Sequence, residues 1–259
     1  MAGLGRHRLG VVVVAAALLC GACGQGHQQT VPTCTSGDVV LTPEQAANAA
    51  TIAAVGRRLG VPDHGVTIAL ATAFQESGLR NLDYGDRDSL GLFQQRPSQG
   101  WGPPAVIRVP RLAAAAFYAH LKRVPGWRSL PVTVAAQRVQ HSGAPDAYAQ
   151  WETPARTLAR ALTGEVPAGL ACHYDPPSLA TAAELRTAAF RLRTQALSEL
   201  GPGGLWRATT SAVVWATAIW LVAQAPSYHL SRVSVKGQVW EARVGAWRPD
   251  PLAGRLAWS

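Results

Sequence analysis

A broad apolar face on one predicted helix is the feature that most constrains how this chain can fold. Over residues 63–77 apolar side chains recur at helical spacing, at Val66, Ile68, Ala69, Ala73 and Phe74. Gly78 follows and can end the helix, because glycine adopts the left-handed conformation of a helix C-cap without strain. A face this broad predicts a buried helix, and it leaves Glu76 in the last turn.

The helix before it is predicted from the residues that start it. Thr42 can serve as the N-cap, Pro43 fits the first helical position, and Gln45 completes a capping box. The alanine-rich pattern that follows stops at Gly60. Residues 79–104 are dense in Gly, Asp, Pro and Gln, which predicts a loop or a short hairpin.

Three further helical patterns complete the predicted domain. They cover residues 111–124, 132–140 and 145–162, and the last is interrupted or restarted at Pro154. The expected fold class is therefore mainly α, with a helical domain over residues 41–172 that carries one irregular lobe.

The remainder of the chain predicts a linker over residues 173–178 and a small α+β module over residues 179–259. The module has helical patterns at 179–200 and 211–225, then alternating strand patterns at 230–235 and 238–244. Its tryptophans favour a packed core, with an exposed glycan-binding strip as the alternative.

The N-terminus has the features of an export signal. Arg6 and Arg8 precede an apolar run over residues 11–19, and small residues follow it, so residues 1–23 are predicted to be a signal peptide. The run is shorter than the roughly 20 apolar residues of a membrane span. Cys23 is a candidate for lipidation, which leaves membrane anchoring and free secretion as equal alternatives.

Export also determines how the cysteines are interpreted. Residues 24–40 are predicted to be a tether, and Cys34 and Cys172 bracket the helical domain. An oxidising compartment favours a disulfide between them. Two thiolates without a histidine at ligand spacing make a poor zinc site, so no metal and no cofactor is expected.

The net charge of +9 indicates an anionic neighbourhood. Nucleic acid, anionic lipid and acidic cell-wall polymers all fit this charge. The lysines and arginines are scattered, and we find no nucleic-acid-binding motif, so a nucleic-acid partner is not expected. A solvated basic surface is favoured over a dedicated polyanion site.

Glu76 has the position of a general acid. A carboxylate at the C-terminal end of a helix lies against the negative end of the macrodipole, and an apolar neighbour such as Phe74 adds desolvation. Both effects favour the protonated acid that glycosidic bond cleavage requires. On these local features alone, a solvated Glu76 paired with Arg80 is the more frequent arrangement.

Three aspartates and two glutamines follow in the irregular segment. Asp83, Asp86 and Asp88 fail the calcium-loop pattern, because no glutamate falls at its bidentate position. They are expected to form turns and pair with nearby arginines. Gln94 and Gln95 offer amide groups for sugar hydroxyls and N-acetyl groups, or for backbone turns.

The order of several motifs resembles the soluble lytic transglycosylases, lysozyme-like enzymes of bacterial cell walls. Glu76-Ser77 followed by residues 89–94, Ser-Leu-Gly-Leu-Phe-Gln, is similar to their Glu-Ser and Gly-Leu-(Met)-Gln signature. Residues 114–121 are similar to a later helix of the family. Residues 136–148 are loosely similar to a third region, but Gln140 and His141 stand where the family has Asn and Ala.

The resemblance covers about residues 41–164 and implies a lysozyme-like helical domain. It implies that Glu76 cleaves the bond between N-acetylmuramic acid and N-acetylglucosamine in peptidoglycan, with an anhydro product and no second carboxylate. Substrate-binding roles are implied for Ser77, Gln94, Gln95, Phe93, Tyr118, Tyr148 and Trp101. A hydrolytic muramidase would instead need a second carboxylate, with Asp83, Asp86 and Asp88 as the candidates.

Two alternatives remain open. Because Gln140 and His141 depart from the family pattern, the domain is alternatively a non-catalytic wall-binding protein. The chain also resembles exported actinobacterial-type proteins labelled as heavy-metal transporters, and Asp83, Asp86 and Asp88 alone suggest metal binding. We find no polytopic membrane pattern and no ligand spacing to support transport. The chain is expected to act as a monomer, outside the cytoplasmic membrane or in the wall.

Overall fold

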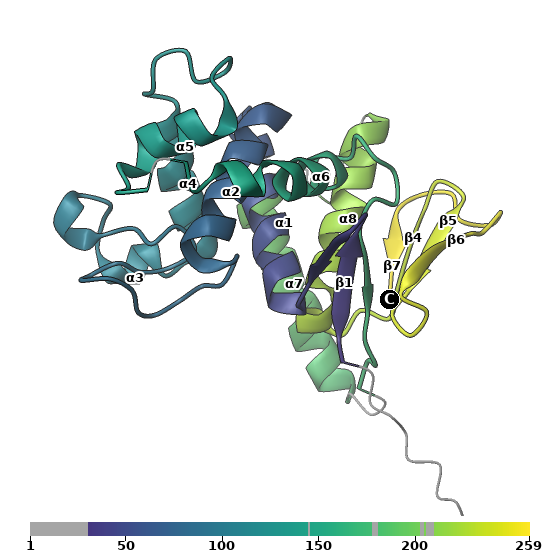
Figure 1. The fold of residues 1–259 in the computed structure, drawn as a ribbon. Coiled ribbons are helices and arrows are strands. Elements are labelled where there is room, and N and C mark those ends of the chain that lie inside the picture. Colours follow the sequence, from purple (N-terminus) through teal and green to yellow (C-terminus); the bar gives the residue numbers. More distant parts are fainter. Residues whose placement is uncertain (1–30, 145, 178–180, 203–204, 206–209) are drawn as a thin grey trace, which may run out of the picture.

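The computed structural model describes residues 31–144, 146–177, 181–202, 205 and 210–259. Within these residues the chain forms eight α-helices and two small antiparallel sheets, a mixed α+β fold (Figure 1). The predicted signal peptide and Cys23 lie outside the described residues. None of the helices in the described ranges combines the length and hydropathy needed to cross a membrane.

The first two helices form as the sequence predicts. Helix α1 (Pro43–Arg58) begins with a capping box, in which the backbone amide of Gln45 donates to Thr42 Oγ1 at 3.3 Å and the amide of Thr42 donates to Gln45 Oε1 at 2.8 Å. Helix α2 (Asp63–Ser77) ends at Gly78, whose φ of 61° is the left-handed C-cap. The capping residues therefore determine where α1 begins and where α2 ends.

Helix α2 lies at the centre of the helical layer (Figure 1). It packs against α1, α4 (Pro110–Leu121), α5 (Val132–Gln140) and α6 (Glu152–Leu162). Eleven of its residues are buried, from Gly65 to Phe74 and at Ser77. The broad apolar face predicted for this segment is thus covered by four neighbouring helices.

The last of these helices begins later than the sequence predicts. Helix α6 starts at Glu152 rather than at residue 145, after a 3₁₀ turn at Ala149–Trp151. Pro154 therefore lies in the first turn of α6, where a backbone N–H has no partner within the helix and its loss costs nothing. The proline starts this helix and does not interrupt it.

The segment between α2 and α4 has little regular structure, as expected. It contains a bridge between Leu90 and Gln95, a 3₁₀ turn at Pro97–Gln99 and the short helix α3 (Pro104–Ile107). This irregular lobe lies at one side of the helical layer (Figure 1).

The segment predicted to be a tether is partly a sheet. Strands β1 (Thr33–Ser36) and β2 (Val39–Leu41) form a hairpin, and β1 also pairs with β3 (Ala171–His173). Cys34 lies opposite Cys172 in this pairing, and the two form the expected disulfide. Because the crosslink and the ladder hold residues 33–41, the tether and the predicted linker at His173 are shorter than expected.

The C-terminal part contains two helices and a four-stranded sheet. Helices α7 (Ala182–Leu200) and α8 (Ser211–Tyr228) precede the sheet, whose strand order is β6-β5-β4-β7. Its strands are β4 (Arg232–Val235), β5 (Gln238–Glu241), β6 (Ala246–Pro249) and β7 (Ala257–Trp258). The β4–β5 hairpin was predicted; β6 and β7 were not, because their short sequences show no alternation.

Helices α7 and α8 both pack against α1, so the C-terminal part shares the core of the helical domain. Glu199 of α7 is 3% exposed at this junction. Its carboxyl accepts hydrogen bonds from Thr51 Oγ1 of α1 at 3.1 Å and from Trp220 Nε1 of α8 at 2.8 Å. Burial raises the pKa of Glu199, against the opposing effect of these donors.

The tryptophans of the C-terminal part mostly lie in the core. Trp215, Trp220 and Trp240 are buried, which confirms the packing interpretation for these three residues. Trp247 is half-buried, and its ring lies edge-on to Trp215 with a centroid distance of 5.3 Å. Trp206 lies outside the described residues.

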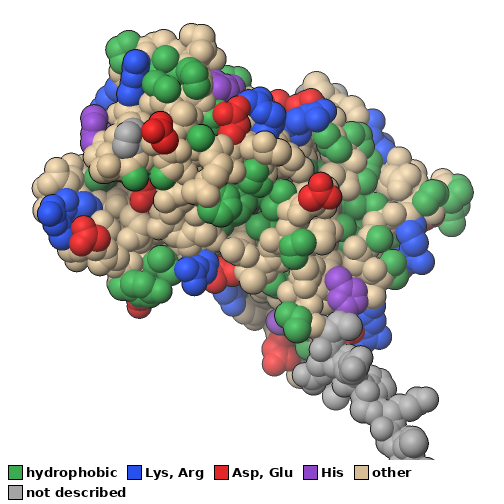
Figure 2. All heavy atoms as spheres, viewed as in Figure 1, with side chains coloured by type: hydrophobic (Ala, Val, Ile, Leu, Met, Phe, Trp, Pro, Cys, Tyr) green, Lys and Arg blue, Asp and Glu red, His purple; other side chains and the backbone are tan. Residues whose placement is uncertain are grey.

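The basic residues do not form a single patch on the face of the molecule that Figure 2 shows. Lysine and arginine side chains are dispersed over this face, and acidic side chains lie beside several of them. On this face the charge has the distribution of a solvated surface.

Replacing both Cys34 and Cys172 by Ala should lower the free energy of unfolding by about 2–5 kcal/mol, because the crosslink closes a long loop in the unfolded chain. The two cysteines are 138 residues apart, so the effect belongs at the upper end of this range. Urea denaturation of the two proteins, without reductant, measures the difference. An unchanged midpoint would contradict the assignment.

Glu199 should make stability depend on pH. The pKa of Glu199 is raised in the folded state. The free energy of unfolding therefore decreases as the pH rises from the unfolded-state pKa of about 4.3 through the folded-state pKa. The melting temperature of wild type should therefore fall from pH 4 to pH 8 relative to Glu199→Gln, with Asp38→Asn as the exposed control. Parallel curves for all three proteins would contradict this.

Candidate active site

Glu76 lies in the last turn of α2, with its side chain half-buried. Next to it, the ring of Phe74 stacks on Trp151 with a centroid distance of 5.0 Å and an interplanar angle of 3°. Trp151 Nε1 donates to Gln75 Oε1 at 2.8 Å, which fixes the indole against the end of α2. Phe74 and Trp151 therefore form an apolar pair at the last turn of α2, the turn that carries Glu76.

Two side chains from the segment around α5 hold the carboxyl of Glu76. The hydroxyl of Tyr148 donates to Glu76 Oε1 at 2.6 Å, the short distance typical of a charge-assisted hydrogen bond. Gln140, at the end of α5, also hydrogen-bonds the Glu76 side chain. Gln140 Nε2 donates to the carbonyl of Phe93 at 2.8 Å, so it links Glu76 to the irregular lobe.

Desolvation by burial raises the pKa of Glu76, and the hydrogen bonds from Tyr148 and Gln140 lower it by less. The pKa of Tyr148 is itself raised by burial and by the adjacent carboxyl, so its hydroxyl remains a donor. Glu76 is therefore a half-buried carboxylic acid with a raised pKa and a fixed orientation. Such a group can give a proton to a leaving oxygen and take one back.

Ser77 fixes the backbone that carries Glu76. Its hydroxyl contacts the carbonyls of Leu92 at 2.8 Å and of Ala73 at 3.1 Å. Ser77 is 4% exposed, so it positions the end of α2 and has no surface for a sugar.

The two glutamines expected to bind sugar hold the irregular lobe. Gln94 Nε2 lies 3.3 Å from the carbonyls of both Tyr84 and Gly91, and Gln94 has a φ of 45°. Gln95 is 1% exposed, and its Nε2 donates to the carbonyl of Ala113 at 3.1 Å. Both side chains are engaged with backbone groups, which is the turn-forming role considered for them.

Phe93 and Tyr118 do not reach the surface. Both are fully buried; Phe93 stacks on Phe117 at 4.6 Å, and Tyr118 donates its hydroxyl to the carbonyl of Ile52 at 3.1 Å. Their aromatic rings fill the core, so they cannot stack on a glycan as expected. Trp101 is half-buried and lies over His120, with ring centroids 3.9 Å apart.

The three aspartates make their ion pairs within the irregular lobe and with arginines beside it. Asp83 lies 4.0 Å from Arg108, and Asp86 lies 3.9 Å from Arg87. The carboxyl of Asp88 accepts from Arg96 at 2.8 Å and from the amide of Ser98, which strongly lowers its pKa. The expected pairing with arginines is thus confirmed for Arg87 and Arg96.

Within the described ranges, no group of three or more His, Cys, Asp or Glu side chains is arranged to hold a metal ion. Asp83, Asp86 and Asp88 are thus not brought together into such a group.

Gln140 contacts Glu76 in this site, although its sequence position gave it no such role. The available signal was its place in the third motif, where it was treated as a departure from the family pattern. In the structure it provides an amide to the carboxyl of Glu76. Arg80, the pairing partner considered for Glu76, instead donates Nε to the carbonyl of Ser77 at 3.2 Å.

A scan of the sequence against models of known protein families found no match, and a search among curated proteins found no relative. The interpretation of this site therefore depends on its geometry and on the motif resemblance.

Replacing Tyr148 by Phe should raise the pKa of Glu76 further, because the variant loses a hydrogen bond to the ionised form. A hydrogen bond to a charged group contributes about 1.5 kcal/mol at the low end, which corresponds to a shift of about one unit. Carbon-13 NMR titration of the Glu76 carboxyl measures this, with Tyr84→Phe as the exposed control. A pKa that stays or falls in the Tyr148 variant would contradict the assignment.

Proposed function

We propose that this chain cleaves the glycan strands of peptidoglycan as a lytic transglycosylase or muramidase on a lysozyme-like domain. One observation carries the proposal: Glu76 lies in the last turn of a buried helix, with a raised pKa and a 2.6 Å hydrogen bond from Tyr148. The motif order from Glu76 to Tyr148 supports the same function. The predicted export signal is compatible with a substrate outside the membrane.

In the proposed reaction Glu76 first acts as general acid. It donates its proton to the oxygen that joins N-acetylmuramic acid to N-acetylglucosamine, so that the leaving group departs as an alcohol. Tyr148 and Gln140 then stabilise the carboxylate that forms, because both hydrogen-bond the side chain. Burial favours the acid before the step, and these donors reduce the cost of ionisation during it.

In the second step the Glu76 carboxylate acts as base. It accepts the proton of the C6 hydroxyl of the muramic acid residue while that oxygen bonds to the anomeric carbon. The product is a 1,6-anhydro ring, Glu76 regains its proton, and no water is consumed. One carboxylate is sufficient for both steps.

The contacts of Asp88 favour this single-carboxylate route over hydrolysis at that residue. Asp83 and Asp86 are exposed and lie near Arg108 and Arg87, and Asp88 is held by Arg96 and Ser98. A hydrolase of the inverting or retaining type needs a second carboxyl at a set distance across the scissile bond. Asp88 is engaged by Arg96 and Ser98, whereas Asp83 and Asp86 have only exposed pairings, so the mass of the product distinguishes the two routes.

Replacing Glu76 by Gln should lower the rate of peptidoglycan digestion by about 10²–10⁴-fold, because the amide cannot transfer a proton. Asp83→Asn and Asp86→Asn should keep wild-type rates, with Glu241→Gln as a remote control. Release of soluble muropeptides measures the rates, and the mass of the product should lack one water relative to a hydrolytic product. Equal rates for Glu76→Gln and wild type would contradict the proposal.

Wild-type activity should fall as pH rises through the raised pKa of Glu76, because the general acid must enter the reaction protonated. If wild type pellets with insoluble peptidoglycan but releases no muropeptide, the chain is a wall-binding protein and the catalytic proposal is rejected.

A further inference from the structure

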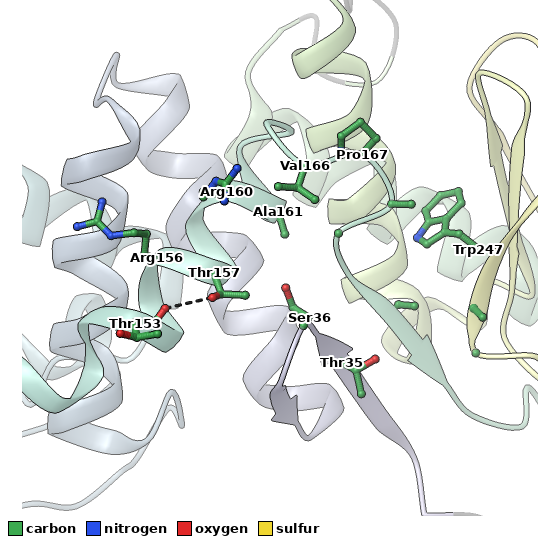
Figure 3. A pocket seen from close by; sticks show the side chains of 16 residues that line it. Thr35, Ser36, Thr153, Arg156, Thr157, Arg160, Ala161, Val166, Pro167 and Trp247 are labelled. Atoms are coloured by element: carbon green, nitrogen blue, oxygen red, sulfur yellow. Dashed lines mark hydrogen bonds between the residues drawn. The ribbon is translucent and has the colours of Figure 1, made fainter.

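The pockets of this protein differ in whether the arginines that line them are paired. One pocket lies between the N-terminal hairpin, α6 and the C-terminal sheet, and Ser36 and Trp247 are part of its lining (Figure 3). The arginines of this pocket, Arg156 and Arg160, form ion pairs with glutamates at 2.6 Å and 2.8 Å. Its positive charges are therefore already matched by negative ones.

A smaller pocket lies between the C-terminal ends of α4 and α5, on the side of the molecule away from the C-terminal sheet (Figure 1). Its volume is about 270 Å³, just below the range of about 300–1,000 Å³ that is usual for small-molecule sites. Four of its lining residues are basic and none is acidic; the four are His120, Arg123, Arg138 and His141. This basic pocket has room for one charged group of a larger ligand.

The two arginines of the basic pocket have no carboxylate partner. In the part of the chain that the structure describes, no ion pair within 4 Å includes Arg123 or Arg138. The remaining residues of the sequence contain no Asp or Glu, so they add no partner. Because guanidinium groups stay protonated in proteins, the pocket carries two positive charges without a counter-charge.

The helix ends account for only part of this charge. Basic side chains near a helix C-terminus stabilise the helix dipole, and each C-terminus carries about half a negative charge. The ends of α4 and α5 together supply about one unit, less than the charge of the two arginines. The pKa of His120 is lowered by burial and also by the charges of Arg123 and His141, so the basic groups repel one another here. An anion in the pocket would relieve this repulsion.

The basic pocket adjoins the residues that hold Glu76. His141 is the C-cap of α5 and lies between Gln140 and Ser142 in the chain. Gln140 hydrogen-bonds the side chain of Glu76, and a side-chain hydrogen bond joins Ser142 to Tyr148. A substrate bound at Glu76 is therefore placed to put an anionic group into this pocket.

We propose that the basic pocket binds a carboxylate of the peptide that muramic acid carries in peptidoglycan, with Arg123 and Arg138 contacting its oxygens. A guanidinium matches the two oxygens of a carboxylate or a phosphate. A carboxylate is favoured because it belongs to the same polymer as the bond at Glu76, whereas unmodified peptidoglycan carries no phosphate. This choice of ligand rests on the function proposed for Glu76; the unpaired charge of the pocket does not.

Muramyl dipeptide is the probe for this site, because it joins one muramic acid residue to a peptide with one free carboxylate and has no glycosidic bond between sugars. The same molecule with its carboxylate amidated is the matched control ligand. Binding to the nitrogen-15-labelled full chain can be followed by NMR through the side-chain Nε–H signals of Arg123 and Arg138. Arg123→Gln and Arg138→Gln assign the two signals.

The free acid should shift both arginine signals in a saturable manner, and the amide should not. Arg123→Gln and Arg138→Gln should each weaken binding of the acid about two- to fivefold, the effect of an exposed ion pair, and the double variant should weaken it more. Arg255→Gln removes the same charge from the C-terminal part and should leave binding unchanged. Because all three arginines are exposed, the melting temperatures should not fall.

Three results would overturn the proposal. Equal shifts with the acid and the amide would show that the pocket does not recognise the charge. No shift with either ligand would reject binding at the pocket. A shift with inorganic phosphate but not with the acid would assign the pocket to a phosphate instead. Peptidoglycan digestion by Glu76→Gln tests the function proposed for Glu76 separately, so the failure of one proposal is distinguishable from that of the other.

Discussion

The burial of α2 by four neighbouring helices is the constraint on which the arrangement of the molecule depends. Because α2 is covered along most of its length, its end has one fixed place, and Ser77 secures that place by a hydrogen bond to the carbonyl of Leu92. The irregular lobe is thereby attached at the point where the helix stops. Glu76, one residue before, is held at the boundary between core and solvent.

The same burial gives Glu76 its chemical character. Desolvation raises the pKa of the carboxyl, and Tyr148 and Gln140 orient it without removing that shift. The fixed position of Glu76 and the raised pKa of its carboxyl therefore have the same cause, which is burial at the end of α2. Phe93 and Tyr118, which look suited to sugar stacking in the sequence, are used instead to build the core that produces this environment.

The two parts of the chain are joined by buried polar groups as well as by apolar packing. Glu199 of α7 accepts hydrogen bonds from Thr51 of α1 and Trp220 of α8, so its carboxyl connects three helices. The Cys34–Cys172 disulfide crosslinks the neighbouring strands β1 and β3. The pocket at Ser36 and Trp247 exists only because these elements meet. A C-terminal part that shares the core can thus add to a surface formed by the helical domain.

The sequence alone determined what depends on local rules: the capping box of Thr42 and Gln45, the end of α2 at Gly78, the β4–β5 hairpin, the disulfide and the position of Glu76 in the last turn of α2. Each follows from the chemistry of a few adjacent residues or, for the cysteines, from the export that the N-terminal sequence predicts. The late start of α6, the strands at residues 33–41 and the contact of Gln140 with Glu76 required the tertiary structure, because partners distant in sequence create them. The tertiary structure also decided which side chains are exposed. A sequence motif can identify Phe93, but only packing determines whether its ring faces a ligand or the core.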